Sequence, residues 1–180
     1  MSESIGLPDT VHALHFDLRV SYGQAYLIDC TDDAEGPEDL LDDHPTHPVG
    51  IIRVEGGDAF LITGLHTGTV DFNVAVAGHD PGADLEGFED VVEISIESES
   101  GEFMLQEWGG ESHELPALPA GPGWYRLRYH ARGMDDAVDG VDLSNGPVDH
   151  YLLQIWPAEE SLPQVVKHSS AAAAYWRRPT

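Results

Sequence analysis

The sequence predicts an all-β protein, an antiparallel β-sandwich of about nine strands with a short C-terminal helix. Two observations support this fold class. Apolar residues alternate with polar ones in many short segments, and Gly- and Pro-containing turns separate those segments at regular spacing. The chain has 180 residues, a length that favours one domain covering 1–180.

The N-terminal third illustrates both signals. Residues 12–20 place Leu14, Phe16, Leu18 and Val20 on one face of a strand. Residues 25–30 follow a short turn, so we expect an opening hairpin. Residues 49–54 and 59–63 flank Glu55-Gly56-Gly57-Asp58, which is a strong turn signal between two apolar runs and predicts a second hairpin.

The remaining strands follow the same pattern. Residues 69–77 alternate cleanly, and residues 91–99 place Val92, Ile94 and Ile96 on one face. A Ser-Gly turn then leads into residues 102–108. Two segments rich in aromatic and β-forming residues, 124–131 and 150–156, complete the set.

Two segments depart from the strand pattern. Residues 161–176 predict a helical tail, in which Ser161 and Gln164 would form a capping box. Residues 31–48 form the longest candidate loop. That loop is acidic, and loops of such length are commonly functional.

Charge is the most unusual property of the chain. It contains 33 Asp and Glu against 8 Lys and Arg, a formal net charge of −25. Residues 55–125 contain 15 carboxylates and no Lys or Arg. Such a surface repels nucleic acid and anionic lipid but attracts basic proteins, so we expect no direct nucleic-acid binding and no membrane binding. An environmental origin remains open, because proteins of halophilic or high-G+C organisms can be acidic and poor in lysine.

The expected location is the cytoplasm. The N-terminal residues lack the basic start and apolar run of a signal peptide, and no apolar stretch approaches the length of a membrane span. Cys30 is the single cysteine, which excludes an internal disulfide.

The acidic residues give a candidate binding surface. In an extended strand, Glu93, Glu97 and Glu99 form a row on one face, with a spacing near twice that of the phosphates along one DNA strand. An acidic strand can therefore imitate DNA to a basic protein. We add the carboxylates of the acidic loop, and the predicted partner-binding residues are Glu93, Glu97, Glu99, Asp32, Asp33, Glu38 and Asp39.

Motifs for catalysis are lacking. There is no nucleophile elbow, no Walker A loop and no dinucleotide-binding glycine motif, so we expect a non-catalytic protein without a cofactor. Two alternatives involve a metal. His44 and His47 lie beside carboxylates in the acidic loop, and the Asp-rich segment 135–149 offers oxygen ligands for calcium. A metal- or small-ligand-binding sandwich is therefore the second hypothesis.

Three segments resemble the nuclease-inhibitor family of the competence protein J type. They are residues 15–27, the expected hairpin at residues 91–108, and residues 118–127 with their Pro/Gly turn before an aromatic strand, together about half of the chain. The acidic insert at 31–48 and the Ala-rich tail depart from the family pattern. The resemblance implies a small acidic β-sandwich that inhibits a nuclease without catalysis, and it assigns no individual residue.

The sequence thus favours a non-catalytic acidic binding protein, an inhibitor or immunity partner of a basic nuclease or toxin. An acidic housekeeping domain is the third hypothesis, and the oligomeric state stays open.

Overall fold

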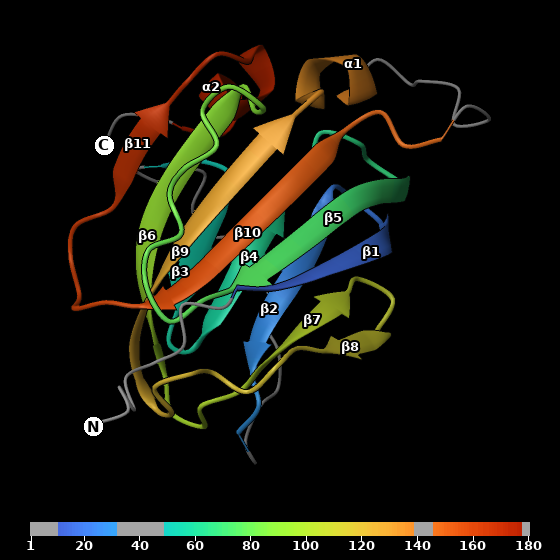
Figure 1. The fold of residues 1–180 in the computed structure, drawn as a ribbon. Coiled ribbons are helices and arrows are strands. Elements are labelled where there is room, and N and C mark those ends of the chain that lie inside the picture. The colour runs from blue at the N-terminus through green and yellow to red at the C-terminus, as the bar shows by residue number, and fades with distance from the viewer. Residues whose placement is uncertain (1–10, 32–48, 139–145, 178–180) are drawn as a thin grey trace.

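Two β-sheets face each other in the computed structural model, which describes residues 11–31, 49–138 and 146–177 (Figure 1). The six-stranded sheet has the order β1 (His12–Val20), β5 (Gly68–Val76), β10 (His150–Pro157), β9 (Gly123–Arg132), β6 (Asp90–Ser98) and β11 (Gln164–Lys167). The five-stranded sheet has the order β3 (Ile52–Glu55), β4 (Asp58–Ile62), β2 (Gln24–Asp29), β7 (Phe103–Glu107) and β8 (Ser112–Glu114). Two short helices, α1 (Met134–Val138) and α2 (Ala171–Trp176), accompany them. The predicted sandwich is confirmed.

The core lies between the sheets because alternate residues of each strand point inward. In β5 the side chains of Val70, Phe72 and Val74 are fully buried, and those between them face outward. Phe72 lies near the rings of Tyr129 and Tyr151 at centroid separations of 6.1 and 6.0 Å. Full burial of a phenyl or branched aliphatic side chain contributes roughly 1.5–3 kcal/mol, so this face stabilises the sandwich.

The connectivity differs from the predicted one at two turns. After β1 the chain turns at Tyr22 and Gly23, both with positive φ, and β2 joins the other sheet. The turn at 100–101 likewise separates β6 from β7, so neither pair of strands is a hairpin. The β3–β4 hairpin around Gly56-Gly57 is confirmed. One strand pair, β5 with β10, is parallel.

The predicted helix at 161–176 is wrong over its first half. Gln164–Lys167 forms the edge strand β11, which pairs with β6, and α2 begins only after Ser170. The Ser170 hydroxyl, not that of Ser161, caps the helix by accepting a hydrogen bond from the Ala173 N–H at 3.0 Å. Val165 and Val166 are β-branched, and the edge of β6 is available for pairing with them. The preference of these residues for a strand, together with this pairing, outweighs the helical spacing of the segment.

The connection between β5 and β6, residues 77–89, covers the middle of the outer face of the six-stranded sheet, and Figure 1 shows it as a green trace in front of that sheet. Gln154 donates a hydrogen bond to the Gly82 carbonyl at 2.8 Å, and the Asp84 N–H donates to His130 at 3.1 Å. This cover removes much of the outer face from contact with partners.

No helix in the described residues is both long and apolar enough to cross a membrane.

Candidate functional site

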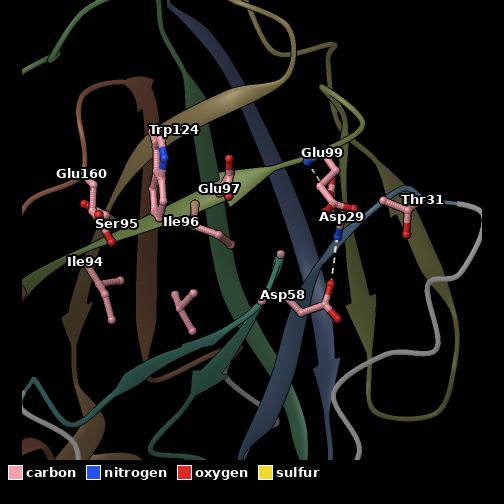
Figure 2. A pocket seen from close by; sticks show the side chains of 13 residues that line it. Asp29, Thr31, Asp58, Ile94, Ser95, Ile96, Glu97, Glu99, Trp124 and Glu160 are labelled. Carbon is pink, nitrogen blue, oxygen red and sulfur yellow. Dashed lines mark hydrogen bonds between the residues drawn. The ribbon is translucent and has the colours of Figure 1, made fainter.

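A cavity of about 640 Å³ opens between the two sheets where the β3–β4 turn approaches β6 (Figure 2). We call it the acidic cleft. Its lining combines five carboxylates with a tryptophan and an apolar floor, and the main members are Asp29, Asp58, Glu97, Glu99, Glu160, Trp124, Val54, Ile94 and Ile96. The lining residues come from both sheets, so the cleft exists only in the folded chain.

The alternation of β6 divides the lining into two kinds. Ile94 and Ile96 pack toward the core, whereas Glu97 faces outward and pairs in register with Trp124 on β9. Figure 2 shows Glu97 beside Trp124, with Ile94 on the opposite side of the β6 ribbon. Trp124 is 37% exposed, which is high for so large an aromatic side chain. The cleft therefore offers acidic groups next to an exposed indole.

Asp29 anchors the inner end of the cleft. Its side chain is buried, and its carboxylate accepts hydrogen bonds from the Ser98 hydroxyl at 2.7 Å, the Glu99 N–H at 2.7 Å and the Ser100 hydroxyl at 2.6 Å. A Cβ atom on Gly57 would lie 3.0 Å from the Asp29 side chain, so a larger residue there would require the turn or Asp29 to move by a few tenths of an ångström. Asp29 is thus a structural group that fixes the backbone carrying Glu99.

The other carboxylates of the cleft have no cationic partner in the part of the chain that the structure describes. Within the described residues, Asp58, Glu97, Glu99 and Glu160 make no salt bridge with any Lys, Arg or His. Burial raises the pKa of Asp58, and the nearby charges of Asp29 and Glu55 raise it further, against a hydrogen bond from the Asp29 N–H. The negative charge of the cleft therefore increases with pH over a higher range than for an exposed aspartate.

Glu93, which the sequence placed in one row with Glu97 and Glu99, has a different environment. Arg126 and Arg128 from the adjacent strand β9 both donate to its carboxylate, at 3.1 and 2.8 Å. Its side chain is only 13% exposed. The strand pattern identifies its face correctly but carries no information that two arginines lie beside it. The charge of Glu93 is therefore balanced by these arginines. The acidic cleft contains Glu97 and Glu99 but not Glu93.

The four predicted loop carboxylates, Asp32, Asp33, Glu38 and Asp39, lie outside the described residues. Thr31, the last described residue before them, lines the cleft. Their part in binding stays a prediction.

The residues of the metal hypotheses are only partly described. His44 and His47 lie outside the described residues, as do positions 139–145 of the Asp-rich segment. Asp135 accepts hydrogen bonds from the Ala171 and Ala172 N–H groups at 3.0 and 2.8 Å, and Asp149 is buried elsewhere. Among the described residues, no group of three or more His, Cys, Asp or Glu side chains is arranged to hold a metal ion.

Asp149 instead gives a prediction about pH. Burial raises its pKa, although its carboxylate accepts hydrogen bonds from the Tyr151 hydroxyl at 2.6 Å and the Leu65 N–H at 3.0 Å. The folded state then holds this proton more tightly than the unfolded state, so the wild type loses stability from this group as pH rises above the ordinary value of about 3.9. We expect Asp149→Asn, which cannot ionise, to gain stability relative to wild type over that range. Urea denaturation of both proteins from about pH 4 to about pH 7 measures the difference, and a difference that does not change with pH contradicts the assignment.

A second cavity, of about 710 Å³, lies near α2 and is lined mainly by apolar and aromatic side chains, including Tyr22 and Trp176. The ring of Tyr22 lies 5.1 Å from those of His66 and Trp108. Asp135 also lines this cavity, but its two oxygens already accept the hydrogen bonds described above. The acidic cleft is therefore the stronger candidate for a charged partner.

Sequence reasoning found Glu97 and Glu99 but missed the rest of the cleft. Asp58 was interpreted only as part of a turn, and Glu160 and Trp124 carried no signal of their own because they belong to separate segments. The pairing of β6 with β9 brings Trp124 beside Glu97.

Comparisons with known proteins agree with this fold. No family model matches the chain, and no curated protein matches it either. Two solved structures do. The first is ComJ from Bacillus subtilis, an inhibitor of the DNA degrading activity of NucA, with a TM-score of 0.59 and 13% identity over 83% of this chain and 99% of that one. The second is described as crocagin biosynthetic gene J, with a TM-score of 0.55 and 12% identity over the same shares. The resemblance to the competence protein J type is thus confirmed at the level of the fold.

Proposed function

We propose that this protein is a non-catalytic cytoplasmic inhibitor or immunity protein that binds a basic nuclease or toxin through the acidic cleft. The observation that carries the proposal is the convergence of Asp58, Glu97, Glu99 and Glu160 on one cavity without a cationic partner among the described residues. The shared fold with ComJ, which inhibits a nuclease, supports the same class of function.

Electrostatics gives the binding mechanism. With a net charge of −25, the protein attracts a cationic partner over several ångströms, and the unpaired carboxylates of the cleft orient the partner as it arrives. The exposed indole of Trp124 then provides an aromatic contact of the kind that dominates binding energy at interfaces. The bound inhibitor occludes the cationic surface that the nuclease uses for DNA.

Charge reversal in the cleft tests this proposal. We expect Glu97→Lys combined with Glu99→Lys to slow association with the partner by at least about ten-fold at low salt and to flatten its salt dependence, because steering depends on these charges. The partner is first identified by affinity capture on the wild-type protein at low and moderate salt. Association rates and inhibition of its DNA degradation are then measured for both proteins.

The matched control changes the net charge equally at other sites. Glu86 and Glu111 are exposed and do not line the cleft, so Glu86→Lys combined with Glu111→Lys reproduces the charge change. We expect this control to retain most of the association rate. Equal rates for the two double variants would show that only total charge matters, and the cleft would lose its assignment.

A further inference from the structure

Strand β6 has an open main-chain edge along half of its length. One of its two main-chain edges pairs with β9 over the whole strand, from Asp90 to Ser98. The other edge pairs with β11 only at Val91, Val92 and Glu93. Within the described residues, no strand is hydrogen-bonded to residues 94–98 on that side. A strand with an unpaired edge presents main-chain donors and acceptors that a further strand can use.

The chain before β11 contacts β6 through side chains and does not pair with its edge. Ser161 exchanges hydrogen bonds with the Ser95 hydroxyl, and Arg126 donates to the carbonyls of Ser161 and Leu162 at 3.1 and 2.8 Å. These contacts hold residues 161–162 through side chains of the outer sheet face. No main-chain hydrogen bond joins residues 158–163 to β6 in the part of the chain that the structure describes. The main-chain groups of the edge beyond Glu93 are therefore not bonded by this segment.

The open edge borders the acidic cleft. Ile94, Ser95, Ile96 and Glu97 all line that cavity, and the β3–β4 turn forms the opposite wall. Five residues of an extended strand span roughly 13–17 Å, so the edge is long enough for a short added strand. The cleft thus combines space for an added strand, a strand edge that can bond to it, and carboxylates without a cationic partner among the described residues.

We propose that an extended segment of the basic partner adds to β6 as a strand that continues the line of β11, and this inference rests on the proposed function. Main-chain hydrogen bonds to residues 94–98 then supply affinity, and Glu97, Glu99 and Glu160 select Lys or Arg side chains on the added strand. The same carboxylates disfavour a second copy of this chain, because two such edges would bring like charges together. Charge therefore decides which strand the edge accepts.

Two peptides of equal charge separate strand addition from simple charge attraction. The first is an acetylated, amidated Lys-Val-Lys-Val-Lys-Val peptide, which has a main-chain N–H at every position. The second replaces each Val with Pro, which removes half of these donors and opposes strand pairing. We expect the Val peptide to bind roughly ten-fold more tightly in calorimetry, the effect of about two main-chain hydrogen bonds. We also expect it to slow hydrogen exchange of those amides in residues 94–98 that point away from β9.

Variants of the full chain locate the peptide. Glu97→Lys should weaken binding of the Val peptide, whereas Glu111→Lys, which changes the net charge equally, should not. Equal affinities for the two peptides without new amide protection would overturn the strand inference and leave the proposed function to its own test. Amides of residues 94–98 that point away from β9 but are already protected in the free protein would also overturn it, because another segment or a second copy would then occupy the edge.

Discussion

Arg128→Ala is expected to lower the free energy of unfolding by about 3–5 kcal/mol, the usual cost of removing one partner from a buried ion pair. The guanidinium of Arg128 donates to Glu93 at 2.8 Å, to Asp80 at 2.7 and 3.0 Å, and to Gln154 at 2.9 Å. It also lies 4.5 Å from the centroid of the Trp156 ring. No water molecule or other side chain can replace a planar group that meets all of these partners at once.

Removal of Arg128 destabilises its hydrogen-bond partners to different extents. The side chain of Asp80 is 49% exposed and regains water when Arg128 is removed. Glu93 and Gln154 are nearly buried and cannot do so, although Arg126 still contacts Glu93. The contact between Asp80 and Arg128 also holds the connection 77–89 on the sheet. The variant should therefore loosen this cover as well as lower the stability.

Denaturation in urea measures the effect, with Arg132→Ala as the control. Arg132 is exposed, donates to the Gly87 carbonyl at 3.2 Å and lies over Phe88, and we expect its removal to cost less than about 1 kcal/mol. Arg128→Lys keeps the charge without the planar fork and should fall between the two. Equal losses for Arg128→Ala and Arg132→Ala would refute the network as a source of stability.

The network also has a pH signature. The hydrogen bonds from Arg128 hold the pKa of Asp80 below its ordinary value despite partial burial. This stabilisation is present above the ordinary pKa and is lost as pH falls through the lowered one. Arg128→Ala should remove that component, so the difference in stability between the two proteins should shrink in acid.

The fold class could be predicted because buried faces leave a direct trace in sequence. Leu18 and Val20 in β1, and Val70 and Phe72 in β5, repeat every second residue as a half-buried strand requires. The same trace shows which face of β6 is apolar. It does not show which strands are neighbours, so it predicts hairpins at the crossings from β1 to β2 and from β6 to β7.

The candidate site was predictable only where it follows one strand. Glu97 and Glu99 belong to the segment whose alternation is clearest, and both line the acidic cleft. Glu93 has the same sequence signal, but its charge is neutralised by β9, a strand about thirty residues away in sequence. Asp58 and Glu160 reach the cleft through tertiary packing, which no local pattern records.

Asp29→Ala is expected to lower the free energy of unfolding by about 2–4 kcal/mol, since a buried donor left without a partner costs about 1–3 kcal/mol and part-buried donors cost less. Three donors lose this acceptor at once, namely the buried Ser98 hydroxyl, the part-buried Glu99 N–H and the Ser100 hydroxyl, which keeps the Glu102 carbonyl at 2.8 Å as an acceptor. They belong to the crossing from β6 to β7, so the loss detaches one sheet from the other at the inner end of the cleft. Denaturation in urea gives the stability, and the loss of partner binding measures the displacement of Glu99.

Removal of a negative charge by itself raises the free energy of unfolding, which opposes the loss expected for Asp29→Ala. In a chain of net charge −25, neutralising one carboxylate reduces repulsion within the folded state. Asp17→Ala isolates this effect, because the Asp17 side chain is 75% exposed, and we expect a change within about 0.5 kcal/mol. Asp29→Asn keeps one acceptor oxygen but turns an N–H group toward a donor, so its loss should be intermediate. If Asp29→Ala matched Asp17→Ala, the carboxylate would carry no structural role at the crossing from β6 to β7.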